Sequence, residues 1–364
     1  MYSFEPTDEQ KMLIDSFQRY AGSDLRPKAH DADEEGGFPP AVIAKGWELG
    51  LLQASIPENL GGFGEYSALT GTLAAEELAW GDLAGAFAIL TPGLFALPVL
   101  LAGNDEQKSE YLPSVIEAEW RPYSAALLEP SFDFDANDLS TQANEKNDTY
   151  VLSGEKVYVP FAADAKALLV YARLGNQTQG FIVPASTPGL IISERQLLMG
   201  INALPLYKVT LNDVKIPKVN RLGGSAGHDF APILDSARIA NAALALGVSR
   251  AAFEYSRDYA KDRDVFGVKV AQKQAIAFML AEMATEIEAI RLLCWEAAWM
   301  FDNKKAEASK FAYLASSSAA DMAIMVTDRA LQILGGHGYI REHPVELWLR
   351  NGRGFSFFTG LAMV

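Results

Sequence analysis

Hydrophobic residues follow a helical period in the first and last parts of the chain. Near the start, Thr7 and Gln10 have the spacing of a helix capping box, and apolar residues continue at helical spacing beyond them. A longer apolar stripe advances in alternating steps of four and three through Ile276, Leu280, Met283, Ile287, Ile290, Cys294 and Ala297. Such a stripe predicts an amphipathic helix that packs against neighbouring helices.

The middle of the chain changes to short runs that are typical of β-strands. They are separated by Gly, Asn, Asp and Pro, and they cover residues 150–152, 167–171, 181–183 and 207–211. The pattern predicts an α+β protein that is mostly α, with a helical part at residues 1–120, a strand part at 121–226 and a helical part at 227–364. We expect the three parts to pack as one body, because no extended linker or low-complexity tract separates them.

Residues 83–103 carry no charged side chain and are long enough to cross a bilayer as a helix. Pro92, Gly93 and Pro98 interrupt this stretch, and each proline removes a main-chain hydrogen-bond donor. We therefore expect buried core helices with a bend, and no membrane span.

Composition narrows the classes of function. Lys and Arg total 31 against 46 for Asp and Glu, so the formal charge is -15, which disfavours binding to nucleic acid and to anionic membrane surfaces. Cys294 is the single cysteine, so no internal disulfide is possible, and its place in the apolar stripe predicts a core residue. The first ten residues lack the basic segment and apolar run of a secretory signal, which predicts a cytoplasmic protein.

Most general catalytic motifs are absent from the sequence. It contains no GxSxG, HExxH, P-loop or paired CxxC. Its four histidines, at positions 30, 228, 337 and 343, do not make a metal-ligand cluster. We therefore expect no metal site.

A glycine-rich run, QILGGHGY at residues 332–339, follows a long helical segment. Three glycines in four positions allow main-chain amides to approach a ligand closely, as anion-binding loops require; the alternative for a bare glycine turn is a helix C-cap. This run resembles the flavin-binding loop of the acyl-CoA dehydrogenase family. The resemblance covers essentially the whole chain, because further stretches agree in order and spacing at residues 56–62, 107–113, 129–130, 154–156 and 263–267 and at Gln274.

The resemblance implies the fold of that family: an N-terminal helical domain, a central β-barrel-like domain and a C-terminal four-helix bundle, assembled as a dimer or a dimer of dimers. It also implies FAD, an acyl-CoA substrate and an electron-transfer flavoprotein or a similar acceptor. Members of the family oxidise the acyl-CoA thioester across its α and β carbons. A carboxylate removes the α proton while the flavin accepts the β hydride, so the cofactor carries the redox step.

The catalytic carboxylate is missing at each position that the resemblance indicates. The usual Glu corresponds to Thr359, whose hydroxyl is far too weak a base, and no acidic residue follows Glu346. Some relatives carry the Glu immediately before an Arg on the first helix of the bundle, where this chain has Ala237 and Arg238. Arg238 either lines the thioester-CoA channel or forms an ion pair on the helix surface. The acyl-pocket helices of the first domain correspond to the uncharged residues 83–103 and offer no base either.

Departures from the family pattern fall in one half of the implied flavin site. In the half that a subunit builds for its own flavin, small or hydroxyl-bearing residues of the family are replaced by Leu128, Phe134, Pro160 and Leu361. The half that reaches the adenosine diphosphate part of a neighbour's FAD is retained, at Arg263, Phe266, Gln274, Gln332, Gly335, Gly336 and Gly338. This asymmetry predicts a non-catalytic subunit that completes the FAD site of a homologous partner carrying the catalytic Glu.

Two other interpretations stay open. A homo-oligomeric acyl-CoA dehydrogenase would use a non-standard base and hold flavin in its own site, whereas an acyl-CoA-binding or interaction protein would have no redox function. Paired subunits of this family often handle bulky ring-bearing substrates, including steroid side chains, which favours that substrate class. The family sequence continues into a further helix beyond the position of Val364; its absence here is compatible with an altered assembly and equally with a short natural terminus.

Overall fold

The computed structural model describes residues 5–364, so the first four residues of the N-terminal stretch that was inspected for a secretory signal lie outside it. The predicted capping box is confirmed: Gln10 N donates to Thr7 Oγ1 over 3.2 Å and Thr7 N donates to Gln10 Oε1 over 2.9 Å. The first helical region comprises α1 (Asp8–Tyr20), the π-helical turn η1 (Ala21–Leu25), η2 (Arg26–Lys28), α2 (Ala29–Glu35), α3 (Pro40–Trp47), α4 (Leu51–Ala54), η3 (Glu58–Leu60), α5 (Ala68–Gly81), α6 (Leu83–Leu90), α7 (Gly93–Ala102) and α8 (Asp105–Val115).

The uncharged stretch forms α6 and α7, which confirms the prediction of buried helices with a bend. The two helices meet at 46° across a short break, and every residue of α6 is buried. Within residues 5–364, no single helix has the length and apolar character to span a membrane, and the bent α6–α7 pair meets that test by length and composition alone.

The central part is a mixed seven-stranded sheet of order β1-β4-β2-β3-β7-β6, with β5 paired to β4. The pairs β1–β4 and β2–β4 are parallel and the other pairs are antiparallel. Each of the four predicted strand runs lies in this sheet. Its strands are β1 (Ser124–Ala126), β2 (Gln142–Lys146), β3 (Thr149–Pro160), β4 (Ala167–Leu174), β5 (Gln177–Pro184), β6 (Leu190–Gln196) and β7 (Leu206–Pro217).

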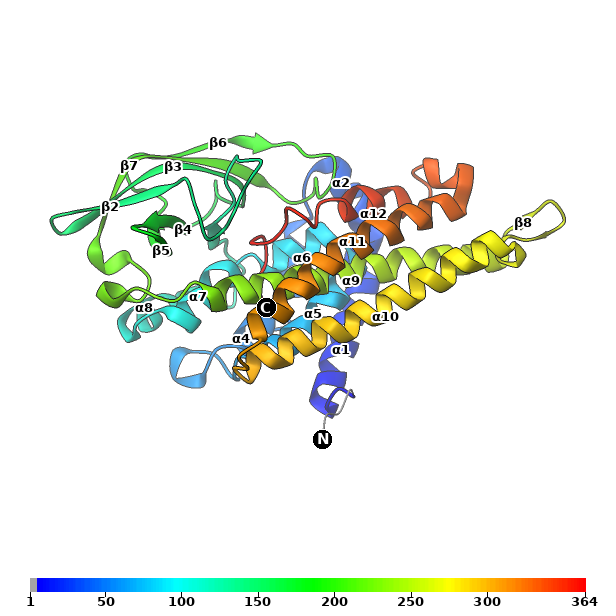
Figure 1. The fold of residues 1–364 in the computed structure, drawn as a ribbon, viewed down its shortest axis with the longest axis horizontal. Helices are drawn as coiled ribbons and strands as arrows, with labels where there is room; N and C mark the ends of the chain where they lie inside the picture. Colours follow the sequence, from blue (N-terminus) through cyan, green and yellow to red (C-terminus); the bar gives the residue numbers. More distant parts are fainter. Residues whose placement is uncertain (1–4) are drawn as a thin grey trace.

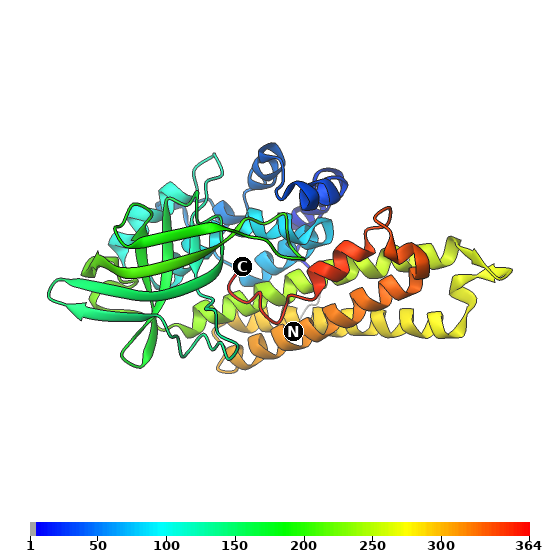
Figure 2. The same ribbon diagram turned by 90° about the horizontal axis from the view of Figure 1, so that it is seen from above.

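Long helices form the last part of the chain. Two short turns, η4 (Lys218–Asn220) and η5 (Gly224–Ala226), lead from the sheet into α9 (Ala231–Asp262). The hairpin β8 (Asp264–Val265) and β9 (Val268–Lys269) with η6 (Val270–Gln272) then joins α9 to α10 (Gln274–Asp302), and α11 (Ala308–Leu334), η7 (Gly335–Tyr339) and α12 (Val345–Gly352) follow. In the predicted stripe on α10, Met283, Ile287, Ile290, Cys294 and Ala297 are buried, as expected. Figures 1 and 2 show the sheet at one end of the long helices and the β8–β9 hairpin at the other.

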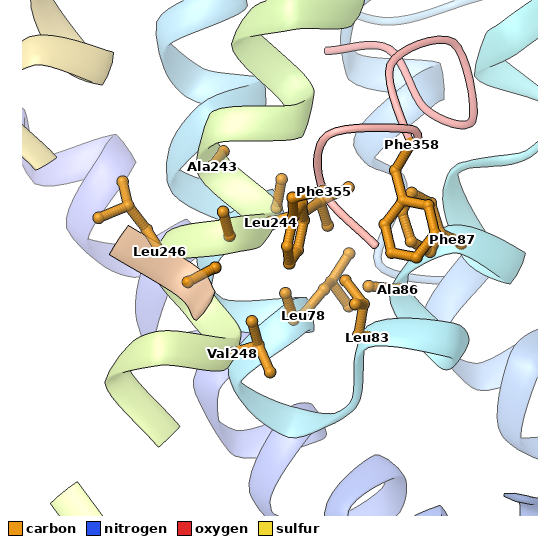
Figure 3. Close-up of a cluster of buried hydrophobic side chains, with 14 of the residues drawn as sticks. Leu78, Leu83, Ala86, Phe87, Ala243, Leu244, Leu246, Val248, Phe355 and Phe358 are labelled. Atoms are coloured by element: carbon orange, nitrogen blue, oxygen red, sulfur yellow. The ribbon is translucent and has the colours of Figure 1, made fainter. Parts of the chain in front are cut away.

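The two helical regions share one core. Figure 3 shows Leu78, Leu83 and Phe87 of the first region packed beside residues of α9 and beside Phe355 and Phe358, which follow α12. Buried charges also join the regions, because Arg250 of α9 contacts Glu76 and Glu77 of α5 over 2.9 and 2.6 Å. The first and last parts therefore do not have separate cores. The domain boundaries near residues 120 and 226 remain predictions from the sequence.

Candidate functional site

A cavity of about 210 Å³ lies where the sheet meets the segment that follows α12. Its lining is entirely apolar or aromatic and comes from β3, the β6–β7 connection, β7 and the last residues of the chain: Tyr158, Leu198, Ile201, Leu206, Phe357, Phe358 and Leu361. One of these residues, Leu361, is a position at which the sequence predicts an altered half-site for the subunit's own flavin, and Tyr158 lies two residues before another, Pro160.

A bulge in β3 shapes the wall of this cavity. The β3–β7 register shifts between Lys156 and Val159, and Tyr158 and Phe161 have φ of +55° and +49°, a region that bulky residues rarely adopt. The amide of Tyr158 donates to Gln196 Oε1 (3.0 Å) and that of Phe161 donates to the Pro205 carbonyl (2.8 Å). Pro160 has no amide hydrogen. The three amide positions therefore have no free donor for a ligand.

A buried ion pair fixes the loop that follows β1 against this strand. Lys156 Nζ lies 2.8 Å from Glu129 Oε1 and donates to the Leu127 carbonyl over 3.0 Å. Burial lowers the pKa of Lys156 to about 8, although Glu129 opposes that shift. Burial alone would raise the pKa of Glu129, but Lys156 and hydrogen bonds from Thr141 hold it below its ordinary value. The pair positions Leu128, whose carbonyl accepts from Val157 N over 2.9 Å.

The two positions at which the resemblance predicts a catalytic Glu lie at or next to one small cavity, and neither has a carboxylate. Ala237 and Gly360, the residue after Thr359, line a second cavity of about 10 Å³ together with Met363. Thr359 is half-buried, and its hydroxyl makes no hydrogen bond to any residue of 5–364. A third cavity of about 30 Å³ lies beyond Met363. None of the described residues that line these three cavities is an Asp, Glu or His.

The Arg238 guanidinium faces a carboxylate of its own helix, α9, and an aromatic ring of α11. It lies 3.6 Å from Asp235 and 5.3 Å from the centre of the Tyr313 ring. Asp235 also accepts a hydrogen bond from Ser309 of α11, and burial raises its pKa. The ion pair that one interpretation predicted for Arg238 is therefore present, while a role toward CoA stays a prediction.

The residues that the sequence predicts as a retained half-site lie at the far end of the long helices, away from the cavities. Both views place η7 and the β8–β9 hairpin at this end (Figures 1 and 2). Arg329 of α11 pairs with Glu282 of α10, which brings the end of α11 beside the start of α10. The seven predicted residues therefore all lie toward this end, in α10, α11, η7 and the segment that joins α9 to α10: Arg263, Phe266, Gln274, Gln332, Gly335, Gly336 and Gly338.

Several of these groups are open to solvent. The Arg263 guanidinium is exposed and forms no ion pair or hydrogen bond with any other described residue. Phe266 is 94% exposed and has φ of +54° in the tight turn between β8 and β9. Gly335 has φ of +58°, and a Cβ built on Gly335 or Gly336 would meet nothing within 4 Å. Gly338, in contrast, is buried against the Leu331 carbonyl.

Hydrogen bonds beneath η7 hold the glycine loop in place. Tyr259 Oη lies 3.0 Å from His337 Nδ1, and Tyr255 Oη lies 2.7 Å from His343 Nδ1. The two imidazole rings stack with centres 5.1 Å apart. Burial and the neighbouring His337 lower the pKa of His343. These aromatic residues connect the loop to the end of α9, directly before Arg263.

Two features of residues 5–364 bear on metal and thiol chemistry. Within residues 5–364, no three His, Cys, Asp or Glu side chains are grouped so that they would hold a metal ion. Cys294 is fully buried, and burial raises the pKa of its thiol. A protonated thiol without solvent access is unreactive, in agreement with the core role that the sequence predicts.

Sequence reasoning missed residues that act over long chain separations. Gln196, 38 residues along the chain, accepts the hydrogen bond from the Tyr158 amide. The hydroxyls of Tyr66 and Ser236 donate hydrogen bonds to the main-chain oxygen of Val364. None of these lies in a recognisable motif. The run of apolar residues from Leu361 to Val364 was the one signal for burial of the last segment.

Comparisons with known proteins identify the class of fold. Sequence models of the acyl-CoA dehydrogenase N-terminal, middle and C-terminal domains match residues 7–119, 124–214 and 230–362. Butyryl-CoA dehydrogenase from Megasphaera elsdenii superposes with a TM-score of 0.89 at 31% identity, covering 99% of this chain and 96% of that one. A chain in the structure of the electron transferring flavoprotein of Acidaminococcus fermentans gives 0.89 at 32% identity, with coverage of 99% and 96%. Helical, mixed-sheet and helical parts in this order define the acyl-CoA dehydrogenase fold.

Sequence identity extends the match from fold to family. The short-chain specific acyl-CoA dehydrogenase of Sus scrofa mitochondria is 35% identical over 371 residues, which cover 100% of this chain and 89% of the relative. The chain therefore belongs to the acyl-CoA dehydrogenase family, whose members depend on FAD.

Proposed function

We propose that the chain is the non-catalytic subunit of a heteromeric, FAD-dependent acyl-CoA dehydrogenase. Its far end, with Arg263 and the glycines of η7, completes the FAD site of a homologous subunit that carries the catalytic Glu. The observation that carries this proposal is the contrast between the two ends of the molecule. One end has an exposed, unpaired cation and an open glycine loop, while the other has apolar cavities without any carboxylate.

The retained end suits the anionic part of FAD. A guanidinium donates charge-assisted hydrogen bonds to phosphate oxygens, and the free space over Gly335 and Gly336 allows main-chain amides to reach a pyrophosphate. When bound, FAD supplies the hydride acceptor for oxidation of the acyl group. This chain's part is to bind and orient the adenosine diphosphate portion, with Gln274 and Gln332 as additional polar contacts at the same end.

The altered end does not suit an isoalloxazine ring. The amides at Tyr158 and Phe161 are already used, Pro160 has none, and Leu361 brings an alkyl side chain to the cavity. A flavin ring placed there would lose hydrogen bonds that it makes with water, without replacement, which is unfavourable for a polar group. We therefore derive no chemical step in this chain's own site.

Exposed apolar side chains supply a surface for the partner. Phe278, Leu292, Tyr313 and Leu314, on α10 and α11, are 59, 46, 56 and 39% exposed, and Phe266 and Tyr339 are more exposed still. Exposed aromatic and aliphatic side chains on two neighbouring helices are a feature of surfaces that other proteins cover. The expected partners are the homologous subunit, acyl-CoA and an electron-transfer flavoprotein or similar acceptor, and cytoplasm is the expected compartment. The named relatives act on short-chain and butyryl-CoA, whereas the pairing of subunits favours bulkier acyl groups.

Purification of the assembly from its native host tests the proposal. We expect two distinct homologous chains, with fewer than one FAD per chain, and turnover only in the mixed assembly. A stable homo-oligomer of this chain with full flavin occupancy and turnover would instead support a homo-oligomeric enzyme with another base. An assembly without any flavin absorbance would support an acyl-CoA-binding protein without redox function.

A matched pair of variants tests the role of the retained end. Arg263→Gln should lower the FAD content of the mixed assembly at least about tenfold at limiting FAD, because it removes a charged contact worth more than 1.4 kcal/mol. Arg257→Gln is the control, since Arg257 is a half-buried arginine of α9, the helix that ends directly before Arg263, and it pairs with Asp258 over 2.8 Å. Equal FAD content in both variants would contradict a phosphate-binding role for Arg263.

A further inference from the structure

Two histidine rings stack beside the glycines of the retained end. His337 stands between Gly336 and Gly338 in η7, and His343 follows six residues later, just before α12. The ring planes differ by 14° and the ring centres are 5.1 Å apart. Both side chains are half-buried, so the pair stays in contact with solvent at the end of the molecule that also carries Arg263 (Figures 1 and 2).

Each ring is held from α9 through one nitrogen. Tyr255 and Tyr259 are four residues apart, so they lie on one face of α9 and reach the two rings together. Tyr259 Oη lies 3.0 Å from His337 Nδ1. Tyr255 Oη lies 2.7 Å from His343 Nδ1. Within residues 5–364, no hydrogen bond reaches Nε2 of either ring, and neither Nε2 atom is enclosed. These two atoms are therefore free to contact a ligand.

The tyrosine hydroxyls fit both charge states of the rings. A neutral imidazole has one donor and one acceptor nitrogen, whereas an imidazolium donates from both. A phenol donates to Nδ1 of the neutral ring and accepts from Nδ1–H of the charged ring, so the hydrogen bond to α9 persists after protonation. Burial raises the pKa of Tyr255, which keeps it a phenol near neutral pH. Nε2–H of the charged ring is then a strong donor with no partner in the chain, which suits a phosphate oxygen.

The groups around the pair disfavour a charge on His343. Burial and the neighbouring His337 lower the pKa of His343, and they outweigh Glu342, which raises it. Arg26 lies behind Tyr255, with its guanidinium 5.0 Å from the centre of the Trp348 ring. Charged side chains on α9, α11, α12 and the connecting loop form ion pairs of their own: Glu254 with Arg250, Asp258 with Arg257, Asp328 with Arg353, Arg329 with Glu282, Arg341 with Glu34, and Glu346 with Arg350 and His30. The pair therefore gains most from an anion that comes from outside the chain.

We propose that the stacked imidazoles of His337 and His343 take up one proton from solvent when the diphosphate portion of a partner's FAD binds at η7, and that the charged ring then donates to this ligand. The proposal rests on the function proposed above, and it adds a second cation to Arg263. A nearby anion favours the charged form of an imidazole. Two charged rings 5.1 Å apart repel each other, so the pair takes up one proton and not two.

This linkage makes the affinity depend on pH. Because the ligand favours the protonated pair, the bound state holds the proton more tightly, and the affinity rises as the pH falls. An ordinary histidine titrates near pH 6.5, so pH 5.5 and pH 8 lie on either side of the change. ADP-ribose is the probe, because neither of its phosphates titrates in this range, whereas a terminal phosphate such as that of ADP has a second pKa of about 6.

Titration calorimetry of the full chain with ADP-ribose measures the effect. We expect binding at least about threefold tighter at pH 5.5 than at pH 8, and uptake of about half a proton per ligand at pH 6, measured in buffers of different ionisation heat. His343→Phe keeps a ring in the stack and removes the charge, so most of the pH dependence and of the proton uptake should disappear. His30→Gln is the matched control, since His30 is also half-buried but faces Glu346 over 3.3 Å, and it should leave both quantities unchanged.

Histidine NMR of the unmodified chain keeps the test valid if His343→Phe does not fold. The chain has four histidines, so their titrations are resolved individually. ADP-ribose should move the titration of the stacked pair to higher pH. It should not move that of His228, whose pKa burial lowers to about 4 and which lies at the sheet end of α9.

The outcomes separate this inference from the proposed function. Equal affinity at the two pH values, the same pH dependence in His343→Phe, or a histidine titration that ADP-ribose leaves in place would overturn proton uptake by the pair. Arg263→Gln should weaken binding at both pH values and retain the pH dependence. Absence of ADP-ribose binding at either pH would instead contradict the diphosphate site itself, and the chain count and flavin ratio test the heteromeric assembly separately.

Discussion

Asp82 allows a quantitative test of how a buried charge affects the stability of the protein. It precedes α6, and its Oδ1 accepts a hydrogen bond from Gly85 N over 2.8 Å, so that it caps the helix that supplies Ile89 and Leu90 to the cavity. Burial raises the pKa of Asp82 from 3.8 to about 6. Hydrogen bonds and His30 lower it somewhat, while the charge of Asp33 raises it further.

The magnitude follows from the two pKa values. They differ by about 2 units, and each unit corresponds to about 1.4 kcal/mol, so the charged carboxylate costs about 3 kcal/mol in the folded state. Folding raises the pKa of Asp82, so the folded state binds this proton more tightly than the unfolded state does. The resulting contribution to the free energy of unfolding is fully present below about pH 3.8 and is lost as the pH rises through about 6. Asp82→Asn keeps a capping oxygen and removes the charge, since Asn is as good a cap as Asp.

Urea unfolding at a series of pH values measures the effect. At pH 8 the Asp82→Asn variant should be more stable than the unmodified chain by up to about 3 kcal/mol, and at pH 5 by about half of that. Asp164→Asn, at an exposed turn position, is the control and should change stability by less than about 0.5 kcal/mol at either pH. A stability difference for Asp82→Asn that does not vary with pH would refute the assignment of this titration to Asp82.

Two further substitutions test the site. Thr359→Glu restores a carboxylate at the usual catalytic position; we expect no dehydrogenation of butyryl-CoA by this chain alone in a dye-reduction assay. A gain of about a hundred-fold to ten-thousand-fold, the usual contribution of a positioned base, would support the homo-oligomeric interpretation instead. Lys156→Met leaves the buried carboxylate of Glu129 without its cation. Urea unfolding should show that the free energy of unfolding falls by about 3–5 kcal/mol. A fall below about 1 kcal/mol would show that the ion pair is not needed to hold β3.

Local patterns were sufficient to predict the elements. The capping box at Thr7 and the stripe on α10 are set by contacts between residues three and four apart, which the sequence displays directly. The bend near Pro92 was predictable for the same reason, because a missing amide donor acts within its own helix. The same patterns gave the order of helical, strand and helical parts, and the family resemblance then identified the fold to which that order belongs.

The interior of the site was not predictable, because its contacts join distant parts of the chain. Tyr66 and Val364 are 298 residues apart and Asn241 and Phe355 are 114 apart, yet both pairs are hydrogen-bonded. No local spacing indicates such pairs. The sequence showed that carboxylates were missing at Ala237 and Thr359, but only the fold shows that Ala237 and the neighbour of Thr359 border one cavity, which is also bordered by Met363.

The two ends of the molecule also differ in whether their polar and aromatic groups find partners within the chain. This difference is the physical argument for a second subunit. At the cavity end, the polar groups that a flavin would need are either absent or bonded within the chain, as with the Tyr158 amide and Gln196. At the other end, Phe266 adopts a left-handed conformation that is unfavourable for a bulky residue and is then left 94% exposed. Replacing Phe266 by Asn or Gly would relieve this strain. It would remove one contact within the chain, with Lys273 Nζ at 5.3 Å from the ring centre, which is worth only about 0.5–1 kcal/mol at an exposed site. A second subunit that covers the ring and shares its flavin with Arg263 would give a reason to keep Phe266.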